Sequence, residues 1–269
     1  MRLTTINTIL FATVWWIGFA SALSVVAEAK AEPPKRLVFA VNSPGAAPYL
    51  YLDTDSNQYV GLVVDFFNTM ADDNQLYVEY IDANRTRSEQ FIYTGKADVF
   101  LSSLVWLKKP NLVISSEELS PNASFLYSTE PFEDNFSLTT LSNERICTRR
   151  AYVYPALTER FTQSVQRVDS SSQKTGLQML LKARCDYLVM NQYNAISLFN
   201  TQDFCHLKFH RSPQPISSVP NALIFSKQNA AIVPIVNDYL RRFKQSGERD
   251  VSLSKHMKRF DRDCEKPPQ

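Results

Sequence analysis

The sequence predicts an α/β protein of two lobes, each a mostly parallel sheet flanked by helices, joined by two hinge segments. Short apolar runs typical of buried strands alternate with segments of helical periodicity, which indicates parallel sheets with helices on their faces. The alternation breaks over residues 111–141, where short β-rich runs such as 136–141 occur. The two α/β units are joined through β-rich, proline-containing segments near 128–136 and 213–221. We therefore expect a discontinuous first lobe of residues 30–130 and 218–269, and a second lobe of residues 131–217.

The first-lobe elements follow from local patterns. Continuous apolar runs predict strands, and apolar residues spaced three and four apart predict helices. A glycine directly after a short helical segment is typical of a helix end. The expected elements are a strand at Leu37–Val41, a helix at Val60–Met70, a strand at Leu76–Ile81, a helix at Ser88–Thr94 ended by Gly95, and a strand at Asp98–Ser102.

The second lobe repeats this alternation, and its first helix opens at Pro155, a residue suited to a first helical turn. The chain then ends in one long amphipathic helix, 228–245, and a shorter one near 252–260. The other expected elements are strands at Arg145–Thr148, Val165–Asp169 and Asp186–Met190, and helices at Thr175–Lys182 and Asn194–Phe199.

Composition excludes several classes of protein. The 269 residues carry 29 Lys and Arg against 27 Asp and Glu, a net charge of +2, so a polybasic nucleic-acid binder is excluded. With 44% hydrophobic residues, the chain has enough apolar surface to fill a core and is not disordered. A globular protein with no nucleic-acid partner is expected.

Residues 1–29 have the three-part pattern of a secretory signal peptide. Arg2 gives a positive start, an apolar run covers Ile9–Ala22, and Ala27-Glu28-Ala29 forms a small-x-small cleavage site. The alternative is an uncleaved membrane anchor, but the run is short for a span and ends at the cleavage pattern. We expect an exported, soluble protein, residues 30–269, with no stable membrane insertion after cleavage.

The chain has four cysteines, all after the predicted signal: Cys147, Cys185, Cys205 and Cys264. An even number in an exported protein indicates disulfides. Four cysteines allow three pairings, and spacing alone selects none. There is no C-x-x-C, so a zinc ribbon or a thioredoxin-like site is not indicated.

Five short motifs in order resemble one protein family. Gly61-Leu62-Val63-Val64-Asp65, followed by an apolar helix, is similar to the G-[FIL]-x-x-D-[LI] signature of the family 3 periplasmic solute-binding proteins, the receptors of polar amino-acid ABC importers. The similarity runs from about residue 37 to about residue 258. The other four motifs are Pro48-Tyr49, Gly95-Lys96-Ala97-Asp98-Val99, Ser102-Ser103-Leu104, and Leu181-Lys182-Ala183-Arg184-Cys185-Asp186-Tyr187.

This resemblance implies a type II periplasmic-binding-protein fold. It implies a cleft between the lobes that captures a small polar solute by hinge closure, and an ABC permease or a membrane-bound sensor as partner. It also implies a location in the periplasm. We further expect a monomer that has no cofactor and is not an enzyme.

Two departures from the family pattern bear on the ligand. Family members that bind amino acids carry a Thr and then an Arg after the S-S-[LM] motif, where this sequence has Leu107 and Pro110. The family's acidic partner for the ligand's ammonium group is replaced by Asn191. The resemblance therefore implies a ligand without the usual α-amino-acid anchors, or a receptor that has lost affinity.

Eight residues in the segments that follow predicted strands are the candidate ligand contacts. Aromatic rings can form cleft walls, a serine can exchange hydrogen bonds, and arginines beside a helix N-terminus favour an anionic group. Lysine at this place would supply a point charge without the planar fork of arginine. The candidates are Tyr49, Ser103, Val105, Trp106, Lys108, Arg150, Tyr152 and Asn191.

Metal binding and catalysis have little support in the sequence. His206 and His210 are four residues apart beside a segment, 204–209, that alternates like a strand, which would place them ~13 Å apart. No metal site is expected. No catalytic motif is found, although a periplasmic dehydratase or lyase on the same scaffold is the alternative. A scaffold that binds another protein is a third interpretation.

The predicted fold favours one disulfide pairing. Cys147 lies on the first strand of the second lobe, and Cys185 adjoins the third. In a parallel sheet of strand order 2-1-3 these strands are neighbours, so a Cys147–Cys185 bond is feasible. Cys205 would then pair with Cys264.

Overall fold

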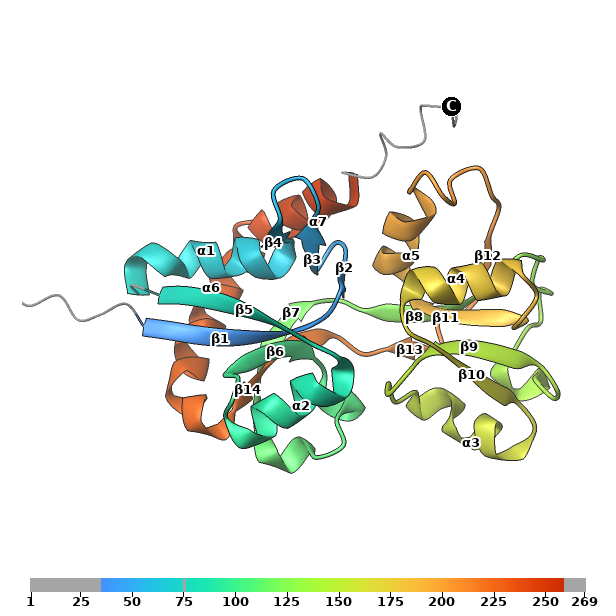
Figure 1. Cartoon of the computed structure of the whole chain (residues 1–269), viewed down its shortest axis with the longest axis horizontal. Helices are drawn as coiled ribbons and strands as arrows, with labels where there is room; N and C mark the ends of the chain where they lie inside the picture. The colour runs from blue at the N-terminus through green and yellow to red at the C-terminus, as the bar shows by residue number, and fades with distance from the viewer. Residues whose placement is uncertain (1–34, 75, 259–269) are drawn as a thin grey trace, which may run out of the picture. The chain divides into compact units, whose positions relative to one another are not determined.

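The computed structural model describes residues 35–74 and 76–258. The predicted signal peptide and Cys264 lie outside these residues. In the described part, no helix is both long and apolar enough to cross a bilayer. The fold is two-lobed α/β, as predicted, with two large sheets and one small one (Figure 1).

The first sheet has the strand order β5-β1-β6-β14-β7. Helix α2 packs on β1, β6 and β14, while α1 packs on β5 and contacts α6 and α7 (Figure 1). Phe39, Phe66, Phe100 and Phe225 are almost completely buried in the core of this lobe. The elements are β1 Lys35–Asn42, α1 Leu62–Asn74, β5 Leu76–Ala83, α2 Arg85–Thr94, β6 Val99–Ser102, β7 Val113–Ser120, β14 Asn221–Ser226, α6 Val233–Gln245 and α7 Glu248–Lys258.

The second sheet has the order β10-β9-β11-β8-β12, with β13 also paired to β8. Successive residues of its central strands point into two apolar layers, one on each face of the sheet. Cys147 and Leu188 pack with α4 and α5, and Ile146 and Val189 pack with α3. The elements are β8 Ala123–Ser128, β9 Arg145–Arg149, α3 Pro155–Gln163, β10 Gln166–Ser170, α4 Gln173–Leu181, β11 Tyr187–Asn191, α5 Gln192–Phe199, β12 His210–Arg211 and β13 Ser217–Ser218.

The chain passes between the sheets twice. It leaves the first sheet after β7 and enters the second at β8, and it returns between β13 and β14. The boundary predicted at residue 130 would leave β8 in the first lobe, whereas β8 pairs with β11 of the second sheet. The first crossing therefore lies at 121–122, where Pro121 offers no N–H to extend the ladder of β7.

Three local expectations are corrected. Residues 204–206 form turns, and the strand begins only at His210. The β-rich run 136–141 contains the 3₁₀ helix η3, Leu138–Thr140. The predicted helix 228–245 divides into the 3₁₀ helix η4, Lys227–Ile232, and α6, because Pro234 begins a helix better than it continues one. Two more short 3₁₀ helices follow β6, η1 Leu104–Trp106 and η2 Pro110–Leu112.

A small sheet that the sequence did not reveal holds the loop containing Tyr49. It comprises β2 Gly45–Ala46, β3 Leu50–Asp53 and β4 Gln58–Val60. Gly61, the first residue of the family motif, has φ +127°, and a Cβ there would lie 2.6 Å from the Tyr49 carbonyl oxygen. The Val63 N–H donates to that oxygen at 3.0 Å. Glycine is therefore required for α1 to begin against the Tyr49 loop.

The Cys147–Cys185 disulfide is confirmed, with Cα atoms 5.6 Å apart. It joins β9 to the residues just before β11, and these two strands are parallel neighbours. Cys205 is also disulfide-bonded. The predicted Cys205–Cys264 bond involves a residue outside the described part of the chain.

Asp65, in the first turn of α1, joins that helix to α7. Its carboxylate accepts hydrogen bonds from Ser252 Oγ at 2.8 Å and His256 Nε2 at 3.0 Å, and Lys255 Nζ lies 3.4 Å away. Burial raises the pKa of the Asp65 carboxyl, but the hydrogen bonds from His256 and Ser252 outweigh it and lower the pKa to about 2. This motif residue therefore has a structural role.

An Asp65→Asn variant is expected to be less stable by about 1–2 kcal/mol at pH 7, a value reduced for the partial exposure of the carboxyl. The folded-state pKa lies below the unfolded value, so this stabilisation is present above about pH 4 and is lost as the pH falls toward 2. Urea unfolding of the natural protein and of Asp65→Asn between pH 7 and pH 3 measures this stabilisation. The difference between their free energies of unfolding should become smaller as the pH falls. Asp203→Asn, which breaks an exposed ion pair with Lys174, is the matched control and should change stability little. A pH-independent difference would contradict this account.

Candidate functional site

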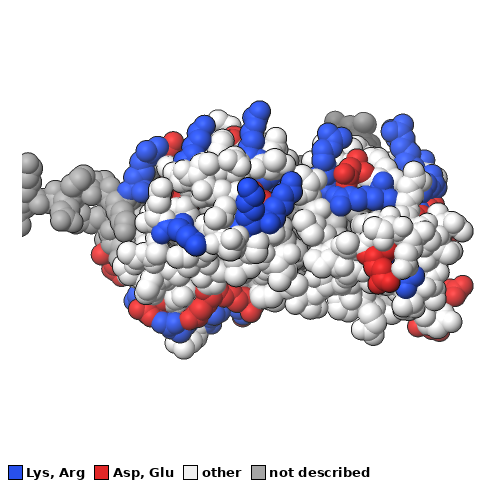
Figure 2. All heavy atoms as spheres, turned by 90° about the horizontal axis from the view of Figure 1, so that it is seen from below, with Lys and Arg blue, Asp and Glu red and all other residues white. Residues whose placement is uncertain are grey.

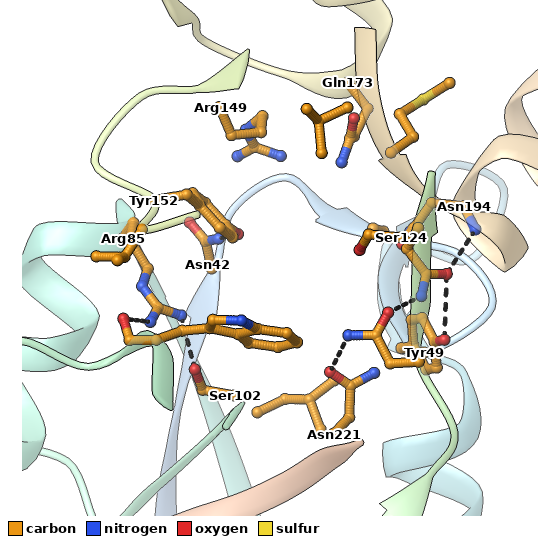
Figure 3. A pocket seen from close by; sticks show the side chains of 18 of the residues that line it. Asn42, Tyr49, Arg85, Ser102, Ser124, Arg149, Tyr152, Gln173, Asn194 and Asn221 are labelled. Atoms are coloured by element: carbon orange, nitrogen blue, oxygen red, sulfur yellow. Dashed lines mark hydrogen bonds between the residues drawn. The ribbon is translucent and has the colours of Figure 1, made fainter. Parts of the chain in front are cut away.

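A cavity of about 170 Å³ lies where residues of both large sheets meet. One water needs ~10–15 Å³ on this measure, so the space suits a cluster of waters or one small molecule. The first lobe contributes the carboxyl end of β1 and the Tyr49 loop, and the second lobe contributes the carboxyl ends of β9 and β11. Polar lining side chains include Asn42, Tyr49, Arg85, Ser102, Trp106, Asn122, Ser124, Arg149, Tyr152, Gln173, Asn191, Asn194 and Asn221 (Figure 3).

Arg85 forms part of the first-lobe wall and is held by local bonds. It begins α2, which is capped by the Asn84 side chain. Its guanidinium donates to Ser102 Oγ at 3.0 Å and to the Trp106 carbonyl at 3.1 Å (Figure 3). It also donates to Glu89 Oε1 at 2.9 Å. Both members of the Arg85–Glu89 pair are buried. Arg85 is therefore neutralised, and its bonds hold η1 with Trp106 at the cavity.

A chain of amides connects the two lobes along another wall. Tyr49 donates from its hydroxyl to Asn191 Oδ1 at 3.2 Å, and burial raises the pKa of that hydroxyl, which keeps its proton. Asn191 donates to Asn122, which in turn donates to Asn221 Oδ1 at 3.2 Å. Asn191 Oδ1 also accepts the Tyr193 N–H at 2.8 Å and so caps α5. Asn191 is thus engaged on several sides.

The second-lobe wall contains a guanidinium without a counter-charge. Arg149 ends β9 and is only 8% exposed. Its guanidinium lies 5.3 Å from the centre of the Tyr152 ring and has no carboxylate partner among the described residues. Gln173, the first residue of α4, has a buried Oε1 without a hydrogen-bond partner. Tyr152 in turn accepts a hydrogen bond from Asn42 of β1 across the cavity.

The electrostatics of the cavity favour a negative or neutral polar group. The described lining residues include two arginines and neither Asp nor Glu. Helices α3, α4 and α5 all begin at the cavity, and helix N-termini carry partial positive charge. On the face in Figure 2, by contrast, basic and acidic side chains both occur with uncharged residues between them, so no continuous basic surface covers that face.

Four of the eight predicted site residues line the cavity: Tyr49, Trp106, Tyr152 and Asn191. The other four do not. Ser103 is buried while its neighbour Ser102 faces the cavity, and Val105 and Lys108 are exposed around η1. Arg150 is exposed and its N–H donates to the Ser170 carbonyl, whereas Arg149 is the arginine at the cavity.

The sequence interpretation missed Arg85, Arg149, Asn122, Gln173, Asn194 and Asn221. A signal existed for Arg149, because in β9 it shares a face with Cys147 two residues earlier. Asn194, in the first turn of α5, donates to the Ala47 carbonyl at 2.9 Å and is a further link between the lobes. Asn122 lies in the first crossing and Asn221 directly follows the second, and short polar residues there carry no strong local pattern.

Residues 38–259 match the family model of the bacterial extracellular solute-binding proteins, family 3. The chain belongs to this family. A search of curated protein sequences finds no significant match. As a family 3 protein, the chain is an extracellular solute-binding protein of the ABC-transporter type.

This solute-binding protein resembles several solved structures. An amino acid ABC transporter substrate-binding protein from Streptococcus pneumoniae, bound to L-arginine, is 16% identical with a TM-score of 0.70, over 84% of this chain and 95% of that one. An ABC transporter binding component from Wolinella succinogenes, complexed with lysine, has the same identity and TM-score over 82% and 95%. A histidine kinase sensor domain similar to periplasmic binding proteins is 16% identical, with a TM-score of 0.69 over 83% and 96%. At these identities the likeness establishes the two-lobed fold.

Proposed function

We propose that this protein captures one small polar solute in the cavity between its lobes, without the arginine and acid that anchor α-amino acids in its family. The observation that supports the proposal is the cavity lining, in which both lobes contribute polar side chains and none of the described ones is Asp or Glu. An α-ammonium group would find no carboxylate there. Asn191, at the family's acidic position, is already bonded to Tyr49 and to the first turn of α5.

Hinge closure is the proposed mechanism of capture. The crossings at 121–122 and 219–220 are the two segments that join the sheets, and we propose the lobe boundaries there. The bonds of Tyr49 with Asn191 and of Asn42 with Tyr152 join the lobes around the cavity. A solute that contacts both walls adds to these bonds and shifts the population toward the closed form.

The closed form would be recognised by a membrane partner. The similar structures include ABC transporter binding proteins and a histidine kinase sensor domain, so a permease and a sensor are both proposed partners. The protein would act as a monomer in the periplasm, after removal of residues 1–29.

The proposal can be tested by the fluorescence of a single tryptophan. Trp15 and Trp16 fall in the predicted signal, so Trp106 is the only tryptophan of residues 30–269, and it lines the cavity. Residues 30–269 are titrated with organic acids, small sugars, polyamines and amino acids while Trp106 emission and the thermal midpoint are recorded. At least one class of solute should change the Trp106 emission and raise the thermal midpoint in a concentration-dependent way. At a solute concentration of 100 times Kd, the folded state should be stabilised by about 2.7 kcal/mol.

An Ala156→Phe variant tests whether that solute binds in the cavity. Ala156 is exposed at the start of α3 and lines the cavity, so a larger side chain fills space without disturbing the core. The variant should keep the thermal midpoint of the solute-free protein and lose the response. A strong response to L-arginine, L-glutamine or L-histidine would contradict the proposed loss of amino-acid anchors, and no response to any class would contradict solute capture.

A further inference from the structure

We infer that the solute is a small hydroxycarboxylic acid without an ammonium group, whose carboxylate binds Arg149 of the second lobe. This inference rests on the proposed function and names the class of ligand and its charged anchor.

The two arginines of the cavity differ in their charged and hydrogen-bonding partners. Arg85 is paired with Glu89 at 2.9 Å and also donates to Ser102 and Trp106. Arg149 is 8% exposed and has no such partner among the described residues. Removing a guanidinium from water without a counter-charge is costly. An anionic ligand that enters the cavity supplies the missing charge.

The residues around Arg149 do not supply a negative charge to its guanidinium. Asp169, on the adjoining strand β10, is bonded to Arg167 at 2.9 Å and to Thr148 at 2.7 Å. The Tyr152 ring lies 5.3 Å from the guanidinium of Arg149 and 5.1 Å from that of Arg85. Both arginines therefore contact the same aromatic ring, which carries no full negative charge. A planar guanidinium fork fits a carboxylate with two parallel hydrogen bonds.

Gln173 selects the second group of the ligand. Ser170 of β10 pairs in register with Arg149 of β9, and Gln173 follows three residues later at the start of α4. Figure 3 shows Arg149 and Gln173 on the same wall with their polar ends turned toward the cavity. The buried Gln173 Oε1 lacks a donor, which a ligand hydroxyl would provide.

The absence of acidic groups excludes the ammonium of an amino acid. None of the described lining residues is Asp or Glu, and three helix N-termini meet at the cavity. A hydroxyl in place of the ammonium carries no charge to be neutralised. Hydroxy acids should therefore bind better than the amino acids of the same skeleton.

Matched pairs of ligands test the inference directly. The protein is titrated with L-lactate and L-alanine, and with L-malate and L-aspartate, while Trp106 emission is recorded. Succinate, which is malate without its hydroxyl, measures the contribution of the hydroxyl to affinity. Each hydroxy acid should bind at least 10-fold more tightly than its amino acid, and L-malate more tightly than succinate. Equal or tighter binding of the amino acids would overturn the inference.

Matched variants test the anchor. Arg149→Gln should weaken hydroxy-acid binding about 10- to 100-fold, the usual worth of a charged hydrogen bond, while Arg150→Gln at the exposed neighbour should change it less than 2-fold. Arg149→Lys keeps the charge but not the planar fork, so its affinity for hydroxy acids should lie between those of Arg149→Gln and Arg150→Gln. Because Arg149 is unpaired without ligand, Arg149→Gln should leave the thermal midpoint of the free protein unchanged or raised. A lowered midpoint with unchanged affinity would assign Arg149 a structural role and overturn the inference.

Failure of this inference can be told from failure of the proposed function. If sugars or polyamines shift Trp106 and the hydroxy acids do not, the ligand class is wrong and solute capture stands. If no solute of any class shifts Trp106, both are wrong.

Discussion

A Glu89→Gln variant is expected to lose about 3–5 kcal/mol of unfolding free energy, because it leaves a buried charge without its partner. Glu89 is 3% exposed and accepts hydrogen bonds from Arg85 Nε at 2.9 Å and from the Tyr93 hydroxyl at 3.0 Å. Arg85 is 4% exposed, so the variant would leave a buried guanidinium without its carboxylate. Urea unfolding at pH 7 measures the loss, and Trp106 emission should change with it because Arg85 bonds the Trp106 carbonyl.

Removing both charges is the matched control for Glu89→Gln. An Arg85→Met/Glu89→Leu variant leaves no unpaired ion and should recover much of the lost stability, although Ser102 and the Trp106 carbonyl lose a donor. A Glu89→Gln protein within about 1 kcal/mol of the natural one would show that water reaches Arg85 in the folded state.

The fold could be predicted because its signals are local and agree with one another. Apolar runs of strand length and helices with clear ends set the alternation, and Gly95, with φ +71°, ends α2 as predicted. The Cys147–Cys185 bond followed from the strand order alone. That β8 belongs to the second sheet was not predicted, because strand pairing is a long-range property that a run of six residues does not encode.

The candidate site was harder to predict because a one-residue shift changes which side chain faces the cavity. The strand predicted at Arg145–Thr148 extends through Arg149, and successive residues of a strand point to opposite faces. The predicted contact was Arg150, whereas its neighbour Arg149 lines the cavity. The helix predicted from Ser88 likewise begins at Arg85, so the cap at Asn84 and the cavity arginine were both missed.

Removing the Cys147–Cys185 disulfide is expected to lower the free energy of unfolding by about 4 kcal/mol. The bond closes a loop with a sequence separation of 38, and closing a loop of this length in the unfolded chain is worth ~4 kcal/mol in the chain-entropy model. Cys147 is on β9, two residues before Arg149, and Cys185 lies two residues before β11, which ends at Asn191. The bond therefore also fixes the two strands whose carboxyl ends carry cavity residues.

A double-mutant cycle separates the cross-link from the packing of the two buried sulfurs. Cys147→Ala, Cys185→Ala and the double variant all lack the bond, so each should lose about 4 kcal/mol and the losses should not add. The singles differ from the double only by one buried thiol, whereas a packing effect would make the double variant's loss the sum of the singles. Chemical reduction is a poorer test, since Cys205 is also disulfide-bonded and would be reduced as well. Additive losses would show that the two sulfurs stabilise this lobe as core side chains, with the loop constraint contributing little.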